Sequence, residues 1–105
     1  MTNAVVGLVT CSSRSEARKI ARALLTKKRA ACVNILGGLE SHYWWRGQLE
    51  TAREFLLLIK TTRPKMGSVT SAVKAAHSYE VPEVIFVNVV EGERNYLEWI
   101  SKSVR

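Results

Sequence analysis

Two cysteines and two histidines are the residues of this chain best suited to chemistry. Cys11 follows a short apolar segment and stands close to the start of a predicted helix, a position that lowers the pKa of a thiol and favours the metal-binding thiolate. His77 stands where a second predicted helix ends. A thiolate and an imidazole together suit copper, particularly Cu(I), or zinc. Each has a simpler alternative, since Cys11 can be a small buried hydrophobe and His77 a hydrogen-bonding residue at a helix end.

Aromatic and polar residues farther along the chain form a second candidate site. Tyr43 and Trp45 share one face of a predicted strand, and Lys60, Tyr79 and Glu83 are the polar residues that could complete a pocket with them. Glu54 could add a further polar group beside Lys60, although two such residues on one strand face more often form a simple ion pair. We place this pocket between subunits of an assembly. The simpler alternative is that the aromatic residues only pack across strands and at an interface.

No catalytic constellation accompanies these residues. The chain contains no Ser-His-Asp triad, since it has no aspartate at all, and neither a P-loop nor a glycine-rich dinucleotide fingerprint is present. We therefore expect a protein without enzymatic activity.

Three apolar segments are the elements that must position these residues. Residues 5–9, 55–59 and 84–90 are apolar almost without interruption, whereas a strand with one wet face alternates apolar and polar residues. The chain offers two sizeable helices, which suffice to cover one face of a small sheet. We therefore expect other copies of the same chain to cover the second face.

The helices and turns can be placed between these strands. Ser13 and Glu16 have the spacing of a capping box, in which each side chain bonds the other residue's backbone N–H. Apolar residues at helical spacing follow them. Pro64 suits the first turn of a second helix that ends near His77, and a short helix follows around residues 96–100. Gly47 supplies the positive φ of a hairpin turn between residues 41–46 and 49–60, long enough to project from the body.

The predicted order is β-α-β-β-α-β with an additional C-terminal helix, within one domain that spans residues 1–105. Two right-handed crossovers of this kind give an α+β, ferredoxin-like sandwich with an antiparallel sheet. One face of that sheet lies under helices and the other is bare. A cyclic homo-oligomer removes the exposed apolar face.

Composition limits the partners and the location. Apolar residues make up 47% of the chain, and none of the apolar runs approaches the roughly 20 residues that span a bilayer. The beginning of the chain lacks the features of a signal peptide, so we expect a cytoplasmic protein. The net charge of +7 favours anionic partners, but no recognition motif accompanies it, which disfavours nucleic-acid binding.

Several segments together resemble one family, the CutA proteins of divalent-cation tolerance. The resemblance rests on residues 30–35 (AACVNI), the hairpin pattern S-x-Y-x-W-x-G-x-L-E over 41–50, LLIKT at 57–61, HSYEVPE at 77–83 and Y-L-x-W at 96–99. These motifs occur in order over nearly the whole chain. The resemblance implies a ferredoxin-like fold, an intracellular homotrimer similar to the trimers of the PII signalling proteins, and a role in the response to divalent metals, most often copper.

The resemblance also assigns a metal site with two departures from the family pattern. Cys11 matches the cysteine of the bacterial copper-binding pattern and His77 matches the second of its two histidines. Ala76 stands where the first histidine belongs, and Ser78 replaces the usual proline. The resemblance therefore implies at most two protein ligands for copper or another divalent metal. The alternative function is a PII-like trimer that binds a small molecule, or signals, through a pocket between subunits.

Overall fold

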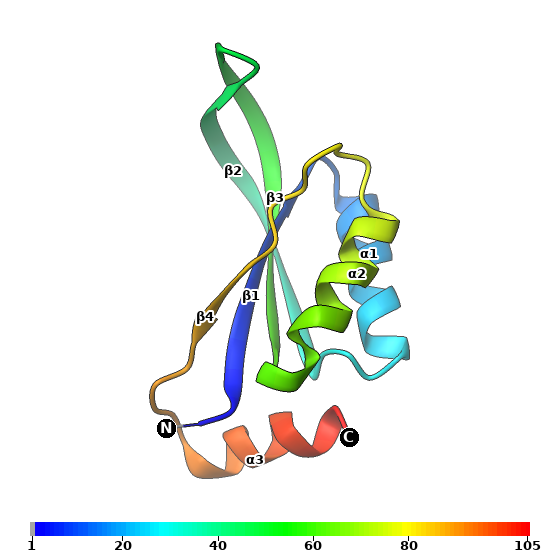
Figure 1. Cartoon of the computed structure of the whole chain (residues 1–105), viewed down its shortest axis with the longest axis vertical. Coiled ribbons are helices and arrows are strands. Elements are labelled where there is room, and N and C mark those ends of the chain that lie inside the picture. The colour runs from blue at the N-terminus through cyan, green and yellow to red at the C-terminus, as the bar shows by residue number, and fades with distance from the viewer. Residues whose placement is uncertain (1) are drawn as a thin grey trace.

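One four-stranded antiparallel sheet and two helices packed on one of its faces make up the body of the molecule (Figure 1). The computed structural model describes residues 2–105. In chain order the elements are β1 (Ala4–Cys11), α1 (Arg14–Thr26), β2 (Cys32–Trp45), β3 (Gln48–Thr62), the 3-10 turn η1 (Arg63–Lys65), α2 (Met66–Ala76), β4 (Ile85–Asn88) and α3 (Arg94–Ser103). No helix in this part of the chain is long and apolar enough to cross a membrane.

The sheet has the strand order β2-β3-β1-β4. β1 runs antiparallel to both of its neighbours, with Leu8 opposite Leu58 on β3 and opposite Ile85 on β4. Each helix therefore connects two strands that have a third strand inserted between them, which is the split β-α-β arrangement. The predicted ferredoxin-like fold and the additional C-terminal helix are confirmed.

β2 and β3 form a hairpin that projects beyond the body (Figure 1). Trp45 pairs with Gln48, and the two residues between them, Arg46 and Gly47, have φ values of 50° and 78°. Positive φ at both central residues is the geometry of a type I′ turn, whose twist matches that of the flanking strands. The pairing is interrupted between Leu36 and Leu39 by an irregularity that contains Gly37 and Gly38.

The start of α1 differs from the predicted capping box. The Ser13 hydroxyl accepts a hydrogen bond from the Glu16 backbone N–H at 3.2 Å, which caps the helix as expected. The Glu16 carboxylate does not complete the box, because it accepts the backbone N–H of Ser78 at 2.9 Å instead. The side chain of Glu16 therefore joins α1 to the segment that follows α2.

The fourth strand is shorter than the predicted span of residues 84–90. Only Ile85–Asn88 pairs as a strand, along Val5–Leu8 of β1. Before Ile85 the chain comes from the segment that follows α2, and after Asn88 it turns toward α3. A hydrogen bond from the Val89 N–H to the carbonyl of Ala4, at 3.1 Å, marks the end of the contact with β1. The apolar pattern therefore extends beyond the paired residues at both ends.

The two faces of the sheet have opposite surroundings. The face under α1 and α2, here called the covered face, buries Val9, Leu57 and Ile59 against Ile20 and Leu24 of α1. The opposite face, here called the open face, has no helix on it. By the strand register it carries Val6, Leu8, Leu36, Leu56, Leu58, Ile85 and Val87. Leu36, Ile85 and Val87 are 47%, 51% and 49% exposed, so the predicted bare face is present in the single chain.

Candidate functional site

Cys11 is the last residue of β1 and lies on the covered face, fully buried. Its thiol donates a hydrogen bond to the carbonyl of Ser13 at 3.5 Å. Burial raises the pKa of the Cys11 thiol, and the charges of Glu16 and Glu54 raise it further, against the lowering effect of a backbone hydrogen bond that Ser13 offers to the thiolate. Burial of the thiol therefore works against the helix-stabilised thiolate that the sequence led us to expect.

His77 ends α2, and its side chain is fully buried. Its Nε2 lies 2.7 Å from the carbonyl oxygen of Thr10, and its Nδ1 accepts the backbone N–H of Tyr79 at 3.0 Å. A neutral ring with its proton on Nε2 makes both bonds at once. His77 thus joins the end of β1 to the turn after α2, and neither ring nitrogen is free in this arrangement.

Cys11 and His77 meet the same short stretch of backbone, since His77 bonds the residue that precedes Cys11. The two side chains nevertheless do not fit a resident copper ion as they stand. The thiol is held protonated, and both nitrogens of the imidazole are bonded to the main chain. Among residues 2–105 no group of three or more His, Cys, Asp and Glu side chains is arranged to hold a metal. Copper binding at these two residues stays a prediction.

Glu16 is the third polar group of this region. Its Oε1 is buried without a hydrogen-bond partner and lies 4.0 Å from Nδ1 of His77. Burial acts to raise the pKa of Glu16, but hydrogen bonds from Ser78 outweigh it, so the net pKa is lowered. The carboxylate therefore stays ionised and fixes the turn that follows His77.

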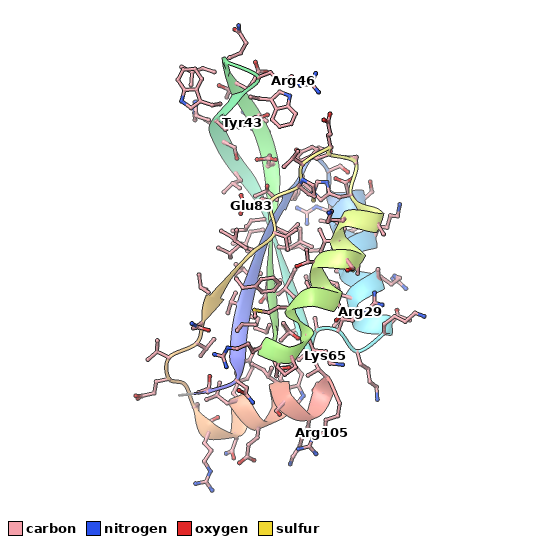
Figure 2. All side chains as sticks on the ribbon, viewed as in Figure 1. Arg29, Tyr43, Arg46, Lys65, Glu83 and Arg105 are labelled. Carbon is pink, nitrogen blue, oxygen red and sulfur yellow. The ribbon has the colours of Figure 1, made fainter. Side chains whose placement is uncertain are left out.

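A pocket of about 630 Å³ is lined by the outer half of the hairpin and by the segment that follows α2. Four of the five residues predicted for a pocket line it together, namely Tyr43, Trp45, Tyr79 and Glu83. Figure 2 shows Tyr43 on the hairpin, with Glu83 nearer the body of the molecule. The other lining residues are Thr10, Ser41, His42, Trp44, Glu54, Glu80 and Val81. The pocket thus combines aromatic rings with three carboxylates.

Lys60, the fifth predicted residue, is absent from the pocket lining. It lies on the open face, and its Nζ donates a hydrogen bond to Oδ1 of Asn34 on β2. It also makes no ion pair with Glu54, the other partner that the sequence offered. Six residues of an extended strand separate Lys60 from Glu54, about 20 Å, which places the lysine beyond the pocket.

Glu54 is the innermost carboxylate of the pocket and is only 7% exposed. The hydroxyl of Tyr79 donates a hydrogen bond to its Oε2 at 2.7 Å. Burial, and then the bond to Glu54, raise the pKa of Tyr79, so the phenol stays protonated. Burial and the charge of Glu54 also raise the pKa of Glu83. The pocket is therefore unfavourable for the negative charges that it contains.

Sequence reasoning missed Glu80 and the contribution of Trp44, and it treated Glu54 only as an accessory to Lys60. Glu80 closes the rim by pairing with Arg46 at 2.9 Å, across to the turn of the hairpin. The available signal was an acidic residue, Glu54, next to the apolar run of residues 55–59. An acid in that position has to find a partner or a cavity when the strand is buried.

The sheet order, the projecting hairpin and the pocket beside it define the class of this protein: a small ferredoxin-like sandwich with an uncovered sheet face. The family model described as "CutA1 divalent ion tolerance protein" matches residues 5–103. The chain therefore belongs to the CutA1 divalent ion tolerance family, and the resemblance found in its motifs is confirmed.

Individual relatives agree with this membership. The "Divalent-cation tolerance protein CutA" of Thermus thermophilus is 44% identical over 98 residues, which cover 93% of this chain and 95% of that protein. The rice "Protein CutA 1, chloroplastic" is 43% identical over 96% of this chain, which spans 57% of that protein's length. The crystal structure of CutA from Xylella fastidiosa superposes with a TM-score of 0.96 at 36% identity, covering 99% of this chain and 100% of that one.

Proposed function

We propose that this chain takes part in the tolerance of divalent cations as a homotrimer located in the cytoplasm. The names of its relatives support the cellular role, since the protein of Thermus thermophilus is called a divalent-cation tolerance protein. The open face of the sheet supports the self-assembly. The cytoplasmic location is an expectation from the amino-acid sequence, and the rice relative is named as chloroplastic.

The exposed apolar area of the open face is the observation that carries the assembly. Ile85 and Val87 on β4 and Leu36 on β2 are each about half exposed, at opposite edges of the sheet. Half-buried apolar residues of β1 and β3 lie between them, so the exposed surface is continuous from edge to edge. A monomer rarely leaves such a surface in water, and closed symmetric assemblies bury it.

Light scattering after size-exclusion chromatography tests the assembly directly. The expected mass is three times the subunit mass of 11.8 kDa. A stable monomer at micromolar concentration contradicts the proposal.

For the cellular role, a strain that lacks the gene is expected to grow more poorly in elevated copper or zinc, and the wild-type gene is expected to restore growth. Equal growth of the two strains over the whole metal series contradicts that part.

A more specific version of the proposed role in metal tolerance is that Cys11 and His77 bind Cu(I) directly. It requires the imidazole of His77 to release Thr10 or Tyr79, because both ring nitrogens are bonded. Competition with a Cu(I) chelator measures the affinity of the wild-type protein and of Cys11→Ser. A loss of one Cu(I) equivalent per subunit in the variant supports the site. Equal affinities exclude Cys11 from metal binding.

Small-molecule binding in the pocket is the second candidate function, and the volume and lining of the pocket favour it. A volume of about 630 Å³ lies within the range of roughly 300–1,000 Å³ that is common for ligand sites. Binding of a small molecule in this pocket is what the alternative function, a PII-like trimer, predicts. Thermal unfolding in the presence of nucleotides, inorganic anions, amines and neutral alcohols tests it. An unchanged midpoint with every compound contradicts this candidate.

A further inference from the structure

The charge of the chain is unevenly distributed, and the pocket beside the hairpin is acidic. Residues 14–29 contain seven lysines and arginines and one glutamate, so most of the net charge of +7 belongs to α1 and the turn that follows it. The pocket, in contrast, is lined by Glu54, Glu80 and Glu83 and by no lysine or arginine among residues 2–105. A cation that approaches this protein is therefore favoured at the pocket over the helix layer.

Two of the three carboxylates in the pocket have no cationic partner. In the described part of the chain, no lysine, arginine or histidine nitrogen lies within 4.0 Å of the carboxylate of Glu54 or Glu83. Glu54 is more than nine-tenths buried, and among residues 2–105 its one hydrogen-bond donor is the neutral hydroxyl of Tyr79. Carboxylates so placed are stabilised by a cation that enters from outside.

The rim of the pocket already shows how a cation is held here. The guanidinium of Arg46 lies 5.4 Å from the ring centre of Trp45 and pairs with the carboxylate of Glu80 at 2.9 Å. One aromatic ring and one carboxylate thus hold an organic cation that the chain supplies itself. Deeper in the pocket, Tyr79 and Glu54 repeat this combination without a cation from the chain.

The lining favours an organic cation over a metal ion. Four aromatic side chains border the pocket, and their ring faces attract ammonium groups. A metal ion instead needs several oxygen, nitrogen or sulfur ligands around one point. None of the groups of His, Cys, Asp and Glu within residues 2–105 supplies three such ligands.

We propose that this pocket binds an organic ammonium compound, specifically a protonated aliphatic diamine or polyamine. One ammonium group pairs with Glu54 and Glu83 beside the rings of Tyr43 and Tyr79, and the apolar chain of the ligand extends along Trp45. The inference rests on the second proposed function, small-molecule binding, and names the class of the ligand.

Calorimetric titration of the intact assembly with putrescine and spermidine tests the inference. Tryptophan fluorescence provides a second readout, since Trp44 and Trp45 both border the pocket. Saturable binding of the amines is expected, with none by 1,4-butanediol, which has the same chain length as putrescine and no charge. Glu83→Gln is expected to weaken the binding about tenfold or more, because a charge-assisted bond is lost. Glu54→Gln is the second variant, since its amide oxygen can still accept the hydroxyl of Tyr79.

Glu91→Gln is the matched control, because Glu91 is exposed in the segment between β4 and α3, outside the pocket. Amine affinities that are equal in the wild type, Glu83→Gln and Glu54→Gln overturn the inference, as does stronger binding of Mg²⁺ or of butanediol than of putrescine. Binding of a nucleotide or anion without any amine binding also overturns it, but leaves small-molecule binding in place. If no compound binds, the result contradicts both the amine inference and the proposed small-molecule binding.

Discussion

The two faces of the sheet are built from the same strands and differ in what covers them. On β3, Leu57 and Ile59 are fully buried beneath the helices, whereas their neighbours Leu56 and Leu58 point to the other side and are only partly buried. An apolar residue under a helix stabilises the subunit itself. An apolar residue on the open face is only partly covered within the described residues of the subunit, so in the proposed assembly its further burial depends on a second copy. Under that proposal a continuous apolar strand encodes folding and assembly in alternate residues.

The largest effect is expected when a charge is placed on the open face. Leu58→Glu puts a carboxylate at the centre of this face, and burying it in an interface without a partner costs several kcal/mol (about 3 or more). We expect a folded subunit that no longer assembles. Light scattering and circular dichroism measure the two properties separately. Leu25→Glu, on the exposed side of α1, is the control and is expected to keep the assembly; an intact assembly in Leu58→Glu removes the open face as the interface.

A cavity on the covered face is expected to act on the subunit instead. Leu57→Ala removes a fully buried side chain from the core around Ile20 and Leu24, and such truncations cost about 2–5 kcal/mol. Urea unfolding at two protein concentrations measures this loss. The loss of stability is expected to be the same at both concentrations. If the loss in the free energy of unfolding disappears at high protein concentration, Leu57 belongs to the interface, and the covered face does not stabilise the subunit by itself.

This contrast explains how much of the fold could be predicted. Apolar runs, the Ser13 cap and Gly47 are local signals, and they located the strands, the first helix and the hairpin turn. Alternation along β2 also placed Tyr43 and Trp45 on one side, where the pocket lies. The length of β4 was overestimated because its pairing partner, and not its composition, decides where it ends.

The candidate metal site shows what a sequence does not contain. The pKa of Cys11 depends on which face of β1 the thiol takes and on how deeply α1 covers it. The hydrogen bonding of the His77 ring depends on the backbone carbonyl of Thr10, which lies 67 positions earlier in the chain. The assignment of Lys60 to the pocket is a different kind of error. The rise per residue of a strand already separates Lys60 from Glu54, so this assignment could have been rejected without a structure.

A smaller effect is expected where the open face meets the pocket. Tyr79→Phe removes the hydroxyl that bonds the buried carboxylate of Glu54, and leaving such a group without its donor costs about 1–3 kcal/mol. Urea unfolding measures the loss. Tyr96→Phe, which alters an exposed tyrosine of α3, is expected to stay within about 0.5 kcal/mol of the wild type. Equal stability of the two variants would show that the Tyr79 bond makes no net contribution.

The smallest effect concerns α3, which packs at the end of the sheet and covers neither face (Figure 1). The Glu93 carboxylate accepts the backbone N–H groups of Asn95 and Tyr96 at 3.0 and 2.9 Å, and these bonds lower its pKa below the ordinary value of 4.5. In the window between the lowered and the ordinary pKa the unfolded chain binds more protons, so this contribution is complete above pH 4.5 and is lost as the pH falls through the lowered value.

Glu93→Gln should therefore be less stable than the wild type near neutral pH, and the difference should shrink as the pH falls through that window. Urea unfolding of both proteins from pH 6 to pH 3 measures this difference, in which the acid response of the rest of the molecule cancels. Glu91→Gln, which changes the same residue type two positions earlier, is expected to show no comparable trend. If the difference in the free energy of unfolding between Glu93→Gln and the wild type stays constant with pH, Glu93 acts through contacts other than its charged cap.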